Sequence, residues 1–260
     1  MGQQRREEGI VMAISDYYFQ MCDALPGREG LLNFNLMCDN LPVLLKGVPL
    51  TLELVFISLS LGFCLAIGVA LMRISNSRTL NMIARSYVFY FRGTPLLVQI
   101  FLIYYGLAQF EAVRESFLWP FFREAYWCGI LALMLNTGAY TAEIIRGGLQ
   151  SVPFGQIESA RAMGMSGLLL YRRIIFPIAF RQALPAYGNE MILMVKGTSL
   201  VSTVTLMEVT GIARYIIAKY WTPVEIFLIA GVIYLVLNFL VTRLVKYLEL
   251  RFTPYLQHPK

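Results

Sequence analysis

The segment Pro153-Phe154-Gly155-Gln156-Ile157-Glu158-Ser159-Ala160-Arg161-Ala162-Met163-Gly164 lies in a polar connection between two long apolar runs. Proline suits the start of a helix, and glycine suits the left-handed turn that ends one. An acidic residue is favoured near the positive end of the helix dipole. The pattern therefore predicts a short helix that starts after Pro153, has Glu158 near its start and ends at Gly164.

The same connection continues into a second helical pattern. This pattern runs from about Ser166 to Phe176, carries Arg172 and Arg173, and should stop at Pro177. About forty residues separate the two apolar runs, far more than a turn requires. We therefore expect two short helices at an angle in a structured connection that spans residues 149–181.

The apolar runs on either side of this connection are long enough to cross a membrane. The chain has 260 residues, 57% of them hydrophobic, and a mean hydropathy of +0.60. A soluble domain is excluded, and we predict an all-α integral membrane protein with about five spanning helices. The expected spans are 48–72, 88–107 with an early interruption at 92–95, 127–147, 186–206 and 224–245.

The distribution of basic residues predicts the orientation of these spans. Arginine and lysine gather in alternate connections, and such connections are usually cytoplasmic. This rule accounts for the net charge of +6 without a nucleic-acid partner. We expect residues 1–40 outside the cytoplasm, a transmembrane domain at 41–250 and a cytoplasmic tail at 251–260. Residues 10–25 form either an amphipathic helix at the outer interface or a partly ordered extension.

Several classes of chemistry are excluded by residue type. His258 is the only histidine, so neither a His-ligated metal site nor His-based catalysis can be built. The chain has no Gly-x-x-x-x-Gly-Lys-Ser/Thr loop and cannot itself hydrolyse ATP. We therefore expect no cofactor on this chain. The four cysteines show no Cys-x-x-Cys spacing and are expected to be small core residues, not disulfide partners: Cys22, Cys38, Cys64 and Cys128.

Polar side chains inside the third and fourth expected spans are candidates for a translocation route, because polar groups at bilayer depth are costly. The alternative is that they fix helix packing by hydrogen bonds and ion pairs. Glu190 and Lys196 lie about 120° apart around their helix, so each needs a partner elsewhere. The candidates are Asn136, Tyr140 and Glu143 on the third span, and Asn189, Glu190, Lys196, Ser199 and Thr203 on the fourth.

The long connection resembles the cytoplasmic signature loop of ABC-import permeases, which begins Glu-Ala-Ala and closes with Ile-x-Leu-Pro. The matching residues are Glu158, Ala160, Gly164, Ile174 and Pro177. Ser159 and Phe176 are mild departures, and Gly197 stands where related chains often have Asp or Asn. The stretches that resemble the polar-amino-acid branch are Arg92-Gly93-Thr94-Pro95, residues 136–148, Ser151-Val152-Pro153, residues 183–190 and residues 196–200.

This resemblance implies a type I ABC-importer transmembrane domain in a bacterial inner membrane. The implied cargo is a polar, and in particular basic, amino acid or an opine. The implied partners are a sister permease or a second copy of this chain, two ATPase subunits that hold ATP and Mg, a solute-binding protein outside the cytoplasm, and membrane lipid. The segment implied to couple to the ATPase consists of Glu158, Ser159, Ala160, Arg161, Ala162, Met163 and Gly164.

Two other functions are alternatives to an ABC permease. A stand-alone secondary carrier or channel is compatible with five spans and intramembrane charges, but it needs no helix that docks on a motor. An intramembrane enzyme lacks a nucleophile and base. For Glu158 and Arg161, the alternative to a docking role is an exposed pair at i, i+3 on a solvated helix.

Overall fold

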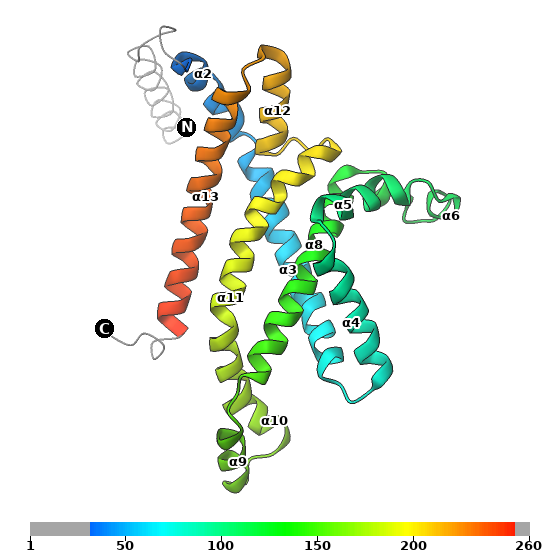
Figure 1. The fold of residues 1–260 in the computed structure, drawn as a ribbon, viewed down its shortest axis with the longest axis vertical. Coiled ribbons are helices and arrows are strands. Elements are labelled where there is room, and N and C mark those ends of the chain that lie inside the picture. Colours follow the sequence, from blue (N-terminus) through cyan, green and yellow to red (C-terminus); the bar gives the residue numbers. More distant parts are fainter. Residues whose placement is uncertain (1–31, 253–260) are drawn as a thin grey trace, which may run out of the picture.

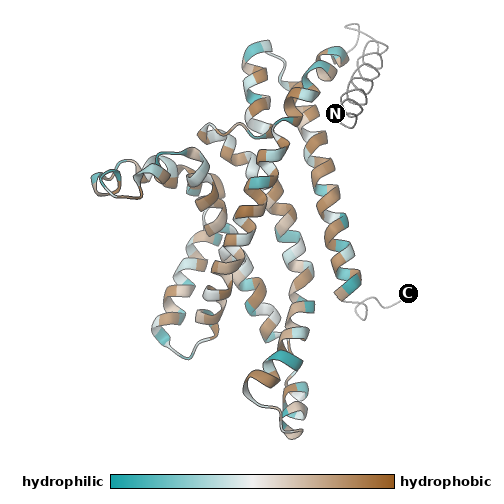
Figure 2. Ribbon diagram, turned by 180° about the vertical axis from the view of Figure 1, so that it is seen from behind, coloured by the Kyte–Doolittle hydropathy of each residue, from teal (hydrophilic) through white to brown (hydrophobic). Residues whose placement is uncertain are grey.

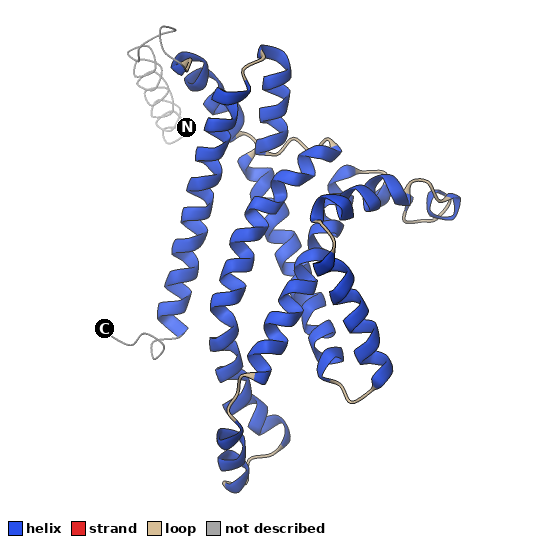
Figure 3. Cartoon of the chain, in the orientation of Figure 1, coloured by secondary structure: helices blue, strands red, loops and turns tan. Residues whose placement is uncertain are grey.

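The computed structural model describes residues 32–252, and all regular structure in this range is helical (Figure 3). Three helices are long and apolar enough to cross a membrane: α3 (Val48–Ile74), α8 (Ala125–Gln150) and α13 (Pro223–Phe252). Two bent pairs raise the number within the described range to as many as five. The all-helical prediction is confirmed, while the expectation for residues 10–25 lies outside the described range.

The second expected span is broken at the predicted interruption, residues 92–95. Helix α4 (Arg78–Gly93) starts ten residues before the expected boundary, and the following α5 (Leu96–Phe101) and η1 (Leu102–Gly106) turn away by 108°. Proline at position 95 has no N–H to continue the helix. The Gln99 amide fills the break by donating to the carbonyls of Phe91 and Thr94, at 2.9 and 3.0 Å. These bonds satisfy backbone groups that the break would leave unpaired.

The fourth expected span also differs from its prediction. The expected helix end at Pro177 is wrong, because the helix continues past this residue. It runs from α10 (Gly167–Leu170) through the π-helical turn η2 (Tyr171–Ile175) into α11 (Phe176–Gly197). Pro177 lies in the first turn of α11, directly after the wider π-helical turn η2, where the backbone hydrogen-bond pattern changes. A 3₁₀ segment, η3 (Thr198–Val204), then leads to α12 (Val209–Tyr220), which is bent by 46° from the preceding helix.

The remaining short helices lie near the ends of the long ones. Helix α2 (Phe34–Leu45) and α12 lie near the top of α13 in Figure 1, and α9 (Phe154–Ala162) and α10 form the lower tip. The segment with α6 (Glu111–Arg114) and α7 (Trp119–Phe122) extends sideways from α5. The molecule thus has an elongated helical body with projections at the bottom and at one side.

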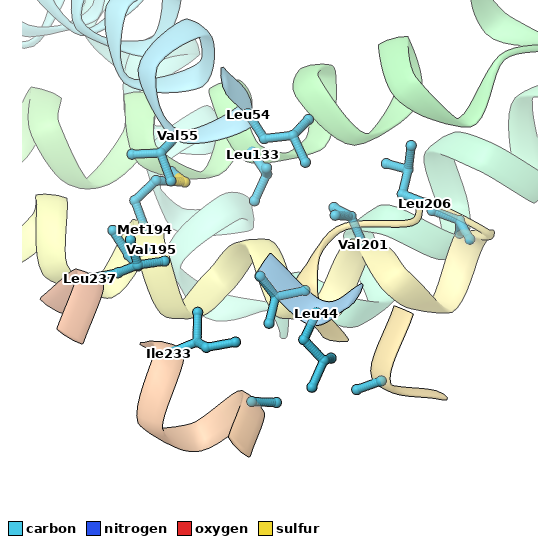
Figure 4. Packing of buried hydrophobic residues seen from close by; sticks show 14 of the residues in the cluster. Leu44, Leu54, Val55, Leu133, Met194, Val195, Val201, Leu206, Ile233 and Leu237 are labelled. Carbon is cyan, nitrogen blue, oxygen red and sulfur yellow. The ribbon is translucent and has the colours of Figure 1, made fainter. Parts of the chain in front are cut away.

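The largest core cluster joins α3, α8, α11, α12 and α13, with side chains such as Leu54, Leu133 and Val195 at its centre (Figure 4). Helices α3 and α8 approach closely at Gly62, where a Cβ atom would lie 2.4 Å from Thr137 Cγ2. Small residues of this kind allow close helix packing where lipid removes the hydrophobic drive. Helix α13 is hydrophobic along most of its length (Figure 2) and leaves Leu235 exposed, as expected for a surface that faces lipid.

The expectation for the cysteines is wrong in part. Cys38 is disulfide-bonded, and Cys64 is an exposed free thiol. Cys128 is buried and free, as a small core residue would be. Sequence spacing does not reveal which thiols come close in space, and that distance decides whether a disulfide forms. Cys22 lies outside the described residues.

Candidate functional site

Helix α9 has the C-terminal cap expected from its glycine. Gly164 adopts φ +82°, the left-handed conformation that glycine reaches without strain. The N–H of Met165 donates to the Ala160 carbonyl at 3.0 Å, and the N–H of Gly164 donates to the Arg161 carbonyl at 2.9 Å. These two bonds form a Schellman motif. The predicted cap at Gly164 is confirmed.

Glu158 does not lie near the start of α9. The helix begins at Phe154, with Pro153 as its N-cap, so that Glu158 is the fifth helical residue and lies beyond the first turn. The helix dipole acts mainly on the first and last turns, and the expected stabilisation of Glu158 by the helix start was wrong. In the described part of the chain, no ion pair joins Glu158 to Arg161.

Helix α9 is attached through one face and exposed on the others. Ala160 is 1% exposed and packs in a small cluster with Val152, Leu170, Ile175 and Ala179. The neighbouring apolar side chains of Phe154 and Met163 are 81% and 70% exposed. The other exposed members of the predicted coupling segment are Glu158, Ser159, Arg161, Ala162 and Gly164. The helix therefore presents a mixed polar and apolar surface beyond the ends of α8 and α11 (Figure 1).

The polar face of α8 contacts the break between α4 and α5. The Asn136 amide donates to Gln99 Oε1 at 2.9 Å and to the Phe91 carbonyl at 3.3 Å. One turn further along α8, the guanidinium of Arg92 lies 5.1 Å from the centre of the Tyr140 ring, within cation–π range. Asn136 thus contacts both α4 and α5 across the break, while Tyr140 contacts the end of α4.

Glu143, at the next position of this face, binds two arginines. One carboxylate oxygen accepts a 2.9 Å hydrogen bond from Arg73 Nε at the end of α3. The other accepts bonds from Arg146 Nε and Nη2 at 2.9 and 2.7 Å. Bonds between charged groups are stronger than neutral ones, so this clamp fixes α3 to α8.

The candidates on α11 and η3 are mostly separated from those on α8. Glu190 is buried and lies close enough to interact with Thr137 of α8 and with the charge of Arg92, although the Thr137 hydroxyl forms no well-aligned hydrogen bond. Asn189 and Lys196 are exposed. Ser199 and Thr203 donate to carbonyls of their own segment, at 2.6 Å in both cases. The structure therefore brings Glu190, but not the other candidates on α11 and η3, toward α8.

A buried carboxylate at the bend between η3 and α12 was missed as a site residue. Glu208 is fully buried at the start of α12, where it accepts hydrogen bonds from the Gly211 N–H at 3.0 Å and the Tyr234 hydroxyl at 2.5 Å. The Thr51 hydroxyl also donates to it at 3.5 Å. Glu208 thereby joins α12 to α3 and α13. Its place before a short apolar helix was the sequence signal for this N-cap role.

Gln99, Arg73 and Arg92 were also missed as polar partners of the α8 face. Gln99 is 2% exposed although it stands in an apolar run, and a buried amide of this kind must be hydrogen-bonded. Residues 32–252 contain no group of three or more His, Cys, Asp or Glu side chains placed to hold a metal ion.

Comparison with known proteins identifies the family. Residues 58–254 match the model of the binding-protein-dependent transport system inner membrane component. The octopine transport system permease protein OccM of Rhizobium radiobacter is 61% identical over 206 residues, which are 79% of this chain and 84% of that protein. The nopaline permease protein NocM of Agrobacterium fabrum is 56% identical over 227 residues, covering 87% and 94% of the two chains.

More distant relatives agree with this match. The histidine/lysine/arginine/ornithine permease protein HisM of Escherichia coli K12 is 43% identical over 215 residues, which are 82% of this chain and 89% of that protein. A crystal structure of an amino acid ABC transporter with histidines has a TM-score of 0.76 and 35% identity, and covers 85% of this chain and 100% of that one. The chain therefore belongs to the family of binding-protein-dependent transport system inner membrane components, and is a permease subunit of an ABC importer.

Proposed function

We propose that this permease subunit imports an opine or a basic amino acid and forms one half of the route through the membrane. The observation that carries this proposal is the high identity to two opine permeases, 61% and 56%, over most of the chain. The histidine/lysine/arginine/ornithine permease is less similar, at 43%. The first two relatives are named for transport of octopine and nopaline and the third for transport of histidine, lysine, arginine and ornithine, and these compounds set the substrate class to be tested.

Helix α9 is the proposed contact with a separate ATPase subunit, where ATP and Mg are bound. Its buried Ala160 anchors it to the body, while Phe154 and Met163 remain exposed beside Glu158 and Arg161. Exposed apolar side chains with charges around them are typical of a protein interface. A short helix fixed at its C-terminus by Gly164 is a suitable lever for a motor that closes on ATP.

The proposed assembly contains a sister permease or a second copy of this chain, two ATPase subunits and a solute-binding protein outside the cytoplasm. The proposed orientation has the N-terminus outside and the C-terminus in the cytoplasm. The excess of basic residues in the connection around α9 supports this orientation. Cys38 is disulfide-bonded and belongs to α2. Helix α2 lies at the opposite end of the molecule from α9 (Figure 1), and the disulfide is also in keeping with an oxidising outer compartment.

The eight intramembrane candidates fall into two groups in this proposal. Tyr140, Asn189, Glu190 and Lys196 line the route or the contact with the sister permease. Lys196 supports this role because it is exposed on α11 without an ion pair among residues 32–252, and an ammonium group facing lipid at that depth is costly. The second group forms hydrogen bonds within this chain: Asn136 and Glu143 bind residues of other helices, whereas Ser199 and Thr203 bind carbonyls of their own segment.

The function can be tested by ATPase assays on the purified parts. The chain alone should hydrolyse no ATP, because it has no phosphate-binding loop. The complex with its ATPase subunits should hydrolyse ATP faster when the solute-binding protein is loaded with octopine, nopaline, arginine or histidine. Failure of all four probes to stimulate hydrolysis would overturn the proposed substrate class.

A further inference from the structure

Three arginines recur every seven residues along α4: Arg78, Arg85 and Arg92. Seven residues are close to two helical turns, so the three side chains share one face. All three are exposed, and none forms an ion pair with another residue in the described range. The face therefore carries guanidinium groups with unused hydrogen-bond donors.

Two open grooves follow this face and share Arg85. The deeper-lying groove has a volume of about 510 Å³, and Phe89 gives it an apolar side. Its lining residues are Arg73, Arg85, Val88, Phe89, Arg92, Gly93, Tyr140 and Glu143. The other groove, of about 340 Å³, continues past Asn81 to Arg78. The arginine face thus borders two open grooves rather than a packed interface within this chain.

The acidic residues near the deeper groove do not balance its positive charge. Both carboxylate oxygens of Glu143 are already bound by Arg73 and Arg146. Glu190 interacts with Arg92 from the α11 side. The guanidinium groups in and beside the groove therefore outnumber the carboxylates by four to two: Arg73, Arg85, Arg92 and Arg146 against Glu143 and Glu190. Arg85 has no acidic partner within residues 32–252. An anion in this groove would meet a net attractive field.

The depth of Arg92 in the membrane indicates what surrounds the arginine face of α4. Arg92 lies about 21 Å from Arg78 along α4 at 1.5 Å per residue, and a bilayer core is about 30 Å thick. A guanidinium exposed to lipid at such a depth costs several kcal/mol. This cost is avoided when the arginine face borders water or the sister subunit. A lipid headgroup can reach Arg78 near the boundary more easily than Arg92.

We propose that Arg85 and Arg92 bind the carboxylate of the transported solute in the groove between α4 and α8. This inference rests on the proposed function, since every amino acid or opine carries a carboxylate. A guanidinium can hold a carboxylate through two parallel hydrogen bonds, and the Tyr140 ring keeps Arg92 in place at 5.1 Å. The clamp on Glu143 removes a competing anion, and Phe89 contacts the aliphatic part of the solute.

The test measures equilibrium binding to the complex of permeases and ATPase subunits, without the solute-binding protein, in nanodiscs of neutral phosphatidylcholine. The probes are radiolabelled L-arginine and L-arginine amide, in which a neutral carboxamide replaces the carboxylate. The wild type should bind arginine at least tenfold more tightly than the amide. Arg92→Gln and Arg85→Gln should each weaken arginine binding tenfold or more but change amide binding less than twofold.

Arg243→Gln is the matched control, because Arg243 also lies over an aromatic ring, at 4.9 Å from the centre of Phe239 on α13, and is absent from the residues that line the groove. It should leave both affinities unchanged. If Arg92→Gln fails to assemble, Arg92→Lys keeps the charge without the two-pronged geometry and should still lose more affinity for arginine than for the amide.

Each contrary outcome identifies what is wrong. Equal wild-type affinity for arginine and its amide, or unchanged arginine binding in Arg85→Gln and Arg92→Gln, would overturn the carboxylate site and leave the proposed function standing. An effect of these variants that appears only in nanodiscs with anionic lipid would assign the arginines to lipid headgroups and also overturn the site. A wild-type complex that neither binds nor transports arginine or octopine would overturn both proposals.

Discussion

Arg73 at the end of α3 donates a 2.9 Å hydrogen bond from Nε to the Glu143 carboxylate on α8. The side chains are only 15% and 13% exposed, and Arg146 occupies the second carboxylate oxygen. Helices α3 and α8 pack closely from Gly62 onward, and the Arg73–Glu143 pair closes the contact at the end where α8 leads into α9. The pair therefore connects the packed body to the projecting helix.

Removal of this clamp should destabilise the permease. Glu143→Ala leaves two guanidinium groups without their partner, so the free energy of unfolding should fall by about 1–3 kcal/mol. Thermal unfolding of the purified complex measures the effect, and a double-mutant cycle with Arg73→Ala isolates the pairwise contribution. The exposed pair Arg123–Glu124, with side chains 60% and 57% exposed, is the control and should contribute less than about 1 kcal/mol. Equal effects of the two pairs would show that the clamp is not structural.

The left-handed turn at Gly164 should be needed for coupling. Gly164→Ala places a Cβ atom in a conformation that costs about 1–2 kcal/mol, and Gly164→Pro cannot adopt the turn because proline fixes φ near −65°. Both variants should insert normally, but solute uptake per ATP hydrolysed should fall, and fall more for proline. Gly231→Ala is the matched control, since a Cβ atom there meets nothing within 4 Å. Unchanged uptake per ATP in Gly164→Pro would mean that α9 only connects α8 to α10.

The exposed charge of Glu158 should affect the same coupling without affecting stability. Glu158→Lys reverses the charge on the surface of α9 that we propose to contact the ATPase, and like charges at an interface weaken association. Binding of the ATPase subunit, measured by pull-down, should weaken, while the unfolding midpoint of the isolated permease should stay within about 1 °C because exposed substitutions change stability little. Full binding by Glu158→Lys would place the contact elsewhere on α9.

The contact between α11 and α13 leaves no room for a side chain at Gly188. A Cβ atom there would lie 2.2 Å from Cγ1 of Val245, so Gly188→Ala should destabilise the protein by about 1–3 kcal/mol. Val245→Ala removes the clashing methyl groups and should restore much of the loss when combined with Gly188→Ala. A double variant no more stable than Gly188→Ala alone would contradict this packing.

The orientation in the membrane can be tested by thiol labelling. Cysteines introduced at Gly155 and Ser116, in a background in which Cys64 and Cys128 are serine, should be labelled from opposite sides. A membrane-impermeant reagent added to intact cells should modify position 116 but not position 155. The reverse pattern would invert the proposed topology.

The sequence was sufficient to predict the features that depend on local chemistry. The apolar runs predicted α3, α8 and α13, and the glycine at position 164 predicted the left-handed cap of α9. The local sequence pattern could not predict contacts between side chains from distant segments. The interruption at residues 92–95 was predicted from Gly93 and Pro95, but no periodicity in the sequence shows that the Gln99 amide binds the carbonyls of Phe91 and Thr94 there.

The candidate site was also predicted only in part from the sequence. The three polar residues on one face of α8 could be read from helical spacing, but their partners could not. Arg73 and Arg92 come from other helices, and Glu190 lies close to Thr137 and Arg92. Helix packing selects these partners, and a single sequence gives residue types and spacing but not which helices become neighbours.

The central claim is that this permease works only with a separate ATP-driven motor, and uptake into proteoliposomes tests it most directly. Vesicles that contain the chain, its sister permease, the ATPase subunits and the solute-binding protein should accumulate radiolabelled octopine or L-arginine only when ATP reaches the ATPase subunits. Vesicles without the ATPase subunits should show no uptake, even with a proton or sodium gradient. Uptake driven by such a gradient in the absence of the ATPase would show a stand-alone carrier and contradict this account.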